Sequence, residues 1–130
     1  MRNTYVFILL VCFTGLASLT ARADTQACTL EGQMNVLGTL VDTKDCMETS
    51  TELPVARFKE SCSALAQLGA IGGGTPAKVT YSEKCPANPQ AACKHFMGQP
   101  ADAYYYRRDA ELLKTTREGC TKTGGTWWVP

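Results

Sequence analysis

The sequence contains a single histidine, His95, and this scarcity restricts the chemistry open to the chain. An imidazole-based metal site needs several histidines, and a hydrolase of the Ser-His-Asp type would depend on His95 alone as its general base. No serine lies in a Gly-x-Ser-x-Gly motif, the setting of the nucleophile in α/β-hydrolases. We therefore expect no metal or other cofactor and no serine hydrolase site of that kind.

Two other catalytic motifs are missing. Thioredoxin-type redox chemistry needs two cysteines a few residues apart, whereas Cys85 and Cys93, the closest pair, enclose a loop with two prolines. The glycines at 72–74 lack the Gly-Lys-Ser/Thr sequence with which a phosphate-binding loop holds a nucleotide. Paired carboxylates for glycoside hydrolysis are available among the acidic residues, but no pair stands out. The motifs therefore do not indicate an enzyme.

Only one long apolar run is present, Tyr5 to Leu19, and it precedes Ala21-Arg22-Ala23. A short apolar stretch after a positively charged start and before small residues is typical of a secretory signal peptide. We expect cleavage before Asp24, which divides the chain into a signal peptide at 1–23 and a single domain at 24–130. The alternative is an uncleaved membrane anchor. Cleavage would place an exported domain in the periplasm or in the medium.

An excess of charge of either sign is also absent. The chain has 13 Lys and Arg residues against 12 Asp and Glu residues, and Arg2 and Arg22 leave with the signal peptide, so the mature net charge is −1. No basic surplus points to nucleic acid or to an anionic membrane. Because no second apolar run is long enough to cross a bilayer, we expect no stable membrane insertion after signal removal.

Cysteine is abundant, with seven residues, of which Cys12 lies in the predicted signal peptide. An even number of cysteines in a short exported chain indicates a disulfide framework, which compensates for the small core of such a domain. Each native disulfide of this kind is worth about 2–5 kcal/mol. We expect three disulfides among the six remaining cysteines, which are Cys28, Cys46, Cys62, Cys85, Cys93 and Cys120.

The connectivity does not follow from the spacing, because six cysteines allow about fifteen pairings. Cys62 and Cys120 lie on the inward faces of two predicted helices, each near a cysteine at a strand end. We therefore favour the pairs Cys62–Cys85, Cys93–Cys120 and, as the remainder, Cys28–Cys46. The main rival joins Cys85 to Cys93 across the proline loop.

The mature chain combines strand-like segments with two amphipathic segments, which predicts an α+β fold. Segment 78–82, for example, alternates so that Val79 and Tyr81 share one face. We expect a small antiparallel sheet with both helices packed on one face and three disulfides as staples. The predicted strands are 36–41, 78–82, 92–97, 101–107 and 126–129, and the predicted helices are about 52–68 and 109–123.

Local signals set the expected boundaries. Gly38 would form a bulge in the first strand, and residues 42–45 would form a polar turn after it. Hydroxyls at 49–51 would cap the first helix, Gly69 would end it in a left-handed conformation, and Asp109 would cap the second. The expected apolar stripe of the first helix consists of Val55, Phe58, Cys62, Leu65 and Leu68.

A weak internal match links the two helices. Glu60-Ser61-Cys62 is echoed by Glu118-Gly119-Cys120, and in both places a strand-like segment precedes a helix with an inward cysteine. A match this short also arises by chance and does not establish a duplication.

The candidate binding surface lies around the sequence Tyr104-Tyr105-Tyr106-Arg107-Arg108. Strand alternation places Tyr105 and Arg107 on the face opposite Tyr104 and Tyr106, and we expect that face to be the outward one. Exposed tyrosine and arginine are typical of binding surfaces. In the pair Trp127-Trp128 one indole points inward and the other outward. The predicted binding residues are Tyr105, Arg107, Arg108 and Trp128; a structural role for both segments is the alternative.

The leading interpretation is a small exported, non-catalytic binding or interaction protein with an unknown protein or glycan partner. One alternative is a small hydrolase, or a hydrolase inhibitor, that acts on envelope or host polymers. Another is a structural component of the cell envelope. A cleft that gathers two carboxylates, or a serine beside His95, would favour the hydrolase.

Overall fold

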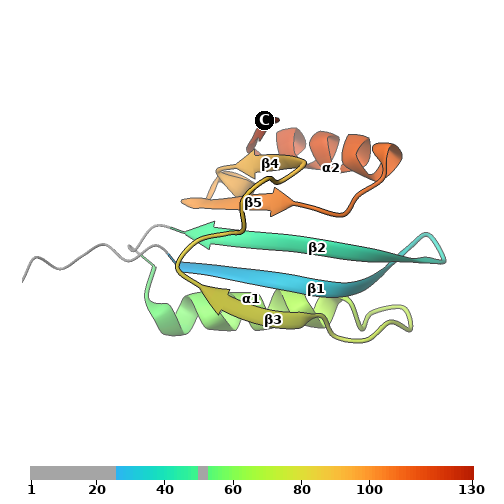
Figure 1. Cartoon of the computed structure of the whole chain (residues 1–130), viewed down its shortest axis with the longest axis horizontal. Helices are drawn as coiled ribbons and strands as arrows, with labels where there is room; N and C mark the ends of the chain where they lie inside the picture. Colours follow the sequence, from blue (N-terminus) through green and yellow to red (C-terminus); the bar gives the residue numbers. More distant parts are fainter. Residues whose placement is uncertain (1–25, 50–52) are drawn as a thin grey trace, which may run out of the picture.

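Six antiparallel strands form one sheet, with two helices packed on one of its faces (Figure 1). This computed structural model describes residues 26–49 and 53–130, so the predicted signal peptide and its cleavage site lie outside the described residues. The strand order is β3-β1-β2-β5-β4-β6. The elements are β1 (Gln26–Val36), β2 (Thr39–Thr49), α1 (Val55–Leu68), β3 (Lys78–Ser82), β4 (Ala91–Lys94), the 3₁₀ turn η1 (Phe96–Gly98), β5 (Ala101–Tyr105), α2 (Ala110–Lys122) and β6 (Thr126–Trp128). The predicted α+β fold is confirmed.

The two halves of the chain have the same topology. The first half runs β1-β2-α1-β3 and the second runs β4-β5-α2-β6; in each half the first strand lies between the other two. The halves join where their second strands, β2 and β5, pair. Each half also carries one disulfide from its first strand to its helix. The short sequence match between the helices therefore falls on structurally equivalent positions.

The six cysteines of the described residues all form disulfides, as expected, but only one of the three predicted pairs is correct. The observed pairs are Cys28–Cys62, Cys46–Cys85 and Cys93–Cys120. The predicted pairs Cys62–Cys85 and Cys28–Cys46 are wrong, and so is the rival pair Cys85–Cys93.

The register of the sheet explains the error. Cys28 lies opposite Met47, whereas Cys46 lies opposite Thr29. Directly opposed residues share a face and successive residues alternate, so Cys28 and Cys46 point to opposite faces. Cys28 therefore meets the helix that covers its face, and Cys46 bonds Cys85 in the connection between β3 and β4.

The first predicted strand, 36–41, is divided by a hairpin turn: Val36 ends β1, and residues 39–41 begin β2. Leu37 and Gly38 join β1 to β2 with φ of 51° and 87°, values typical of the tight turn with two left-handed residues. Gly38 is thus a turn residue and not a bulge. The expected polar turn at 42–45 is also wrong, because these residues pair with β1 throughout. Regular pairing with a neighbouring strand here outweighs the low strand propensity of Asp and Lys.

The first helix begins at Val55, after Pro54, and no side chain caps it. The expected hydroxyl caps are not confirmed: Thr49 belongs to β2, and the two neighbouring positions lie outside the described residues. Of the predicted stripe, Phe58 and Cys62 are buried; Leu65 is half-buried, and Val55 and Leu68 are exposed.

Gly69 follows α1 but is right-handed, with φ of −61°, so the predicted left-handed stop is wrong. Glycine is required for a different reason. A Cβ at this position would lie 2.8 Å from the carbonyl oxygen of Thr75. The loop after α1 therefore folds tightly back against the helix end.

The second helix matches the prediction closely. Asp109 caps it, and the Asp109 carboxylate accepts a hydrogen bond from the Leu112 amide at 2.8 Å. Strands β4 and β5 end earlier than predicted, at Lys94 and Tyr105. The chain leaves β4 through His95, which adopts a positive φ of 52° and cannot continue the strand.

Candidate functional site

Three residue pairs line up on the helix-covered face of the sheet where β2 pairs with β5, and we call this row of pairs the trough. At its centre Met47 lies opposite Ala103. Two residues away on one side is the pair Asp45–Tyr105, and two residues away on the other is the pair Thr49–Ala101. Because all three pairs share the helix face, their side chains decide how each end of the trough is filled.

The Asp45 end is filled. Tyr105 stacks on Trp127 at 5.7 Å between ring centroids, and the Arg108 guanidinium lies 4.5 Å from the centre of the Tyr105 ring. Arg108 donates to Asp45 Oδ2 at 2.6 Å and to Thr116 Oγ1 at 2.9 Å. These contacts connect β2, β5 and α2 in one cluster.

Burial is the main cause of the pKa shifts in this cluster. It raises the pKa of Asp45 above its ordinary value, and the neighbouring Arg108 offsets this only in part. Burial also raises the pKa of Tyr105 to about 12. The cluster therefore resembles a structural core in which charge is costly, and its members are not available to a ligand from solvent.

This arrangement overturns part of the predicted binding surface. The Tyr105 residue is only 5% exposed, so the expectation that it faces outward is wrong. The side chain of Arg108, the predicted binding residue after this strand, is only 8% exposed. Tyr105 pairs with Asp45 and Ala91 on the helix face, which reverses the predicted faces of its strand. Of the four predicted binding residues, Arg107 and Trp128 are exposed.

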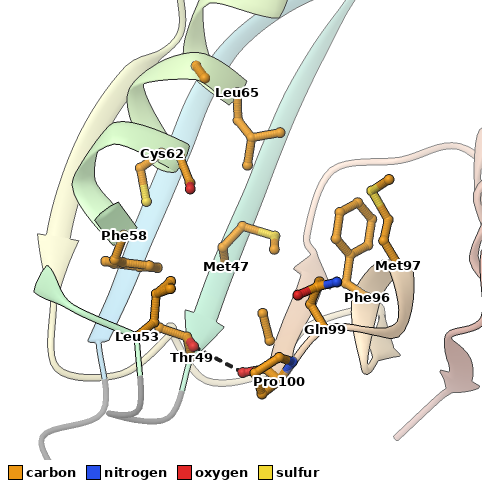
Figure 2. A pocket seen from close by; sticks show the side chains of 13 residues that line it. Met47, Thr49, Leu53, Phe58, Cys62, Leu65, Phe96, Met97, Gln99 and Pro100 are labelled. Atoms are coloured by element: carbon orange, nitrogen blue, oxygen red, sulfur yellow. Dashed lines mark hydrogen bonds between the residues drawn. The ribbon is translucent and has the colours of Figure 1, made fainter. Parts of the chain in front are cut away.

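The opposite end of the trough is open. Thr49 and Ala101 are small, and a pocket of about 440 Å³ lies above them, between α1 and the segment that contains η1. Figure 2 shows Phe58, Cys62 and Leu65 on one wall, Phe96 and Met97 on the other, and Met47 between them. The remaining lining residues are Leu53, Ser61, Ala64, Gln99 and Pro100.

The lining is almost entirely apolar. Among residues 26–49 and 53–130, none that lines the pocket is charged, and the polar side chains of this lining are Thr49, Ser61 and Gln99. The Thr49 hydroxyl donates to the carbonyl of Pro100 at 2.9 Å, a contact drawn in Figure 2. An apolar pocket of a few hundred Å³ with few polar groups is typical of small-molecule sites.

The wall formed by Phe96 and Met97 has an unusual backbone. His95 and Met97 adopt left-handed conformations, with φ of 52° and 54°, and Met97 is exposed at the rim. Such conformations cost about 1 kcal/mol or more for a non-glycine residue, and they gather at ligand-binding segments. The turn is held in place because the His95 amide donates to Asp102 Oδ1 at 3.0 Å.

In the described part of the chain no helix covers the other face of the sheet, but the β3–β4 connection crosses it. Its anchors are the Cys46–Cys85 disulfide, the Cys85 amide bound to Glu48 Oε2 at 2.8 Å, and the Tyr106 hydroxyl bound to the Pro86 carbonyl at 2.6 Å. Burial is the main cause that raises the pKa of Tyr106 to about 12.

A polar cluster on this face surrounds Lys94. The Lys94 ammonium donates to Asp102 at 3.0 Å and to the Tyr104 hydroxyl at 2.6 Å, and it lies 5.9 Å from the centre of a Trp128 ring. Burial lowers the pKa of Lys94, but these hydrogen bonds outweigh it and raise the pKa above its ordinary value. Arg107, the other exposed predicted residue, lies 3.5 Å from Glu31. The cations are thus already paired.

The described residues of two pockets do not form a catalytic arrangement. Of the residues that the structure describes, the pocket between α1 and η1 contains Ser61 but neither His95 nor a carboxylate, and a smaller pocket of about 170 Å³ beside β3 contains one carboxylate, Glu83. Within residues 26–49 and 53–130, no group of three or more His, Cys, Asp or Glu side chains is arranged to hold a metal ion. None of the helices in this part of the chain is long and apolar enough to cross a bilayer.

The chain matches no protein-family model, and no curated protein or solved structure shows significant similarity to it. The candidate site is therefore identified from its geometry alone. Sequence reasoning missed Phe96 and Met97 because it placed them at the end of a strand. The sequence signal for a turn here is Gly98-Gln99-Pro100, because glycine and proline interrupt a strand.

Proposed function

We propose that this protein is an exported, non-catalytic binding protein that holds an uncharged, apolar ligand in the pocket between α1 and η1. The observation that carries the proposal is the open apolar end of the trough, a pocket of about 440 Å³ whose lining residues, in the part of the chain that the structure describes, carry no charge. The three disulfides support an oxidising compartment, periplasmic or extracellular.

The chemistry of the lining defines the ligand class. Two aromatic rings, Phe58 and Phe96, and two thioethers, Met47 and Met97, offer polarizable surface that adapts to the shape of a ligand. A charged group would lose its hydration in this pocket and find no partner of opposite charge among the described lining residues. We infer a ligand with an aliphatic chain or an uncharged ring system, which differs from the protein or glycan partner expected from the sequence.

The pockets also favour binding over hydrolysis. Within the described residues, neither of these two pockets gathers two carboxylates, and neither brings a serine to His95. Those were the arrangements that would have supported the hydrolase alternative.

The test places a bulky side chain in the pocket from the surface of α1. Ala64 is an exposed residue of α1 that lines the pocket, and Ala56 is an exposed alanine of the same helix that does not. We expect the wild-type protein to bind the uncharged dye Nile red with enhanced fluorescence, Ala64→Trp to bind at least about tenfold more weakly, and Ala56→Trp to bind normally. Equal binding by the two variants, or no binding by the wild type, would contradict the proposal.

A further inference from the structure

Two segments at one end of the molecule carry no charge. Residues 33–41, at the tip of the β1–β2 hairpin, and residues 69–77, in the loop between α1 and β3, contain no Asp, Glu, Lys or Arg, although 19% of the chain is charged. Figure 1 shows both segments at the same end of the molecule. The nearest charged neighbours in sequence, Asp42 and Lys78, have opposite signs.

Exposed aliphatic side chains project from this end. Leu37 is fully exposed, at 101% of its reference area, and Leu40, Leu68 and Ile71 are exposed as well. Leu37 also has a positive φ of 51° in a turn position where Asn or Gly is the usual residue. The side chain therefore contributes no burial to folding, and its backbone is strained. A contact with another molecule would explain both the exposed side chain and the strained backbone of Leu37.

The two segments are held together by one side chain. Asn35 Nδ2 donates to the carbonyl of Gly72 at 2.8 Å, and Asn35 Oδ1 accepts from the amide of Gly38 at 2.8 Å. One amide thus fixes the hairpin turn and ties it to the loop that bears Ile71. The apolar end is a built surface that presents side chains from two distant parts of the sequence.

We propose that this uncharged end, residues 33–41 and 69–77, inserts shallowly into the interface of a lipid bilayer. A protein partner would be expected to meet the Trp, Tyr or Arg anchors that dominate protein–protein hot spots, whereas the exposed apolar side chains here are all aliphatic. A surface without charge enters hydrocarbon without the cost of burying an ion. The contact is peripheral and does not cross the bilayer. It goes beyond the proposed function and involves none of the pocket residues.

The test uses flotation with neutral phosphatidylcholine vesicles, because the surface has no basic cluster that would need anionic lipid. We expect the wild type to float with the vesicles and Leu37→Asn to partition at least about tenfold more weakly. The control Val129→Asn removes another exposed aliphatic side chain, outside these two segments, and should float like the wild type. Ile71→Ser, in the second segment, should also weaken flotation.

Stability provides an independent readout of the same variant. Because asparagine tolerates the left-handed turn better than leucine, Leu37→Asn should raise the melting temperature by about 4 °C while it weakens flotation. Loss of flotation with a lower melting temperature would indicate damage to the fold and overturn the proposal. So would a wild type that does not float, a Leu37→Asn variant that floats normally, or a wild type that self-associates through Leu37 and ignores vesicles.

Discussion

The assignment of the sheet faces can be tested with two adjacent tyrosines. Tyr105 is buried on the helix face, where it stacks on Trp127 and supports Arg108. Tyr104 lies on the other face and is half-buried. The two residues have the same side chain and the same strand, so Tyr105→Ala and Tyr104→Ala differ mainly in what each side chain contacts.

The expected costs differ severalfold. Truncation of a buried aromatic ring typically costs about 3–5 kcal/mol, and the stacking on Trp127 is part of that value. We therefore expect Tyr105→Ala to lower the free energy of unfolding by about 4 kcal/mol, a large share of the roughly 5–15 kcal/mol of a typical domain. Tyr104→Ala removes a half-buried ring and its 2.6 Å hydrogen bond with Lys94, which we expect to cost about 1 kcal/mol.

The assay is equilibrium unfolding in urea with the disulfides intact, followed by far-UV circular dichroism so that the signal does not depend on the tryptophan beside Tyr105. A larger cost for Tyr104→Ala than for Tyr105→Ala would refute the face assignment and, with it, the filled end of the trough. Similar costs of about 1 kcal/mol for both variants would show that Tyr105 is not a core residue.

Two further predictions concern the pairing of the cysteines and the loss of stability at alkaline pH. Mass spectrometry of unreduced peptides should find the bridges Cys28–Cys62, Cys46–Cys85 and Cys93–Cys120, and a bridge from Cys28 to Cys46 would contradict the register of the hairpin. The folded-state pKa of Tyr105 is raised from 10.0 to about 12, so its stabilising effect is complete below about pH 10 and is lost as the pH rises through about 12. Between about pH 9 and pH 12, the free energy of unfolding measured by urea titration should therefore fall by about 2 kcal/mol less in Tyr105→Phe than in the wild type. Identical decreases would show that the pKa of Tyr105 does not change on unfolding.

The alternation of apolar residues predicted several elements correctly. Segment 78–82 is a strand, Asp109 caps the second helix, and Phe58 and Cys62 face the core. These features depend on interactions within a few residues, such as a carboxylate and the amide three positions later. Local patterns in the sequence are sufficient to predict them.

The candidate pocket was not predictable in the same way. It exists because Thr49 and Ala101, which are far apart in the sequence, oppose each other across β2 and β5 and are both small. The equivalent pair on the other side of Met47 contains Tyr105, which fills its end of the trough. Whether a position is filled or empty depends on the register between the two halves, which no local pattern specifies.

Composition and spacing were therefore enough to establish a small α+β domain with three disulfides, because cysteine number and amphipathic periodicity are properties of the chain itself. The pairing of the cysteines and the face on which each tyrosine lies required the complete sheet. A shift of one residue in strand register moves every side chain to the opposite face, and the single turn at Leu37-Gly38 sets the register of the longest pair of strands. That turn separates Cys28 from Cys46, whereas the pairing of β5 with β2 and β4 buries Tyr105 and leaves Tyr104 on the uncovered face.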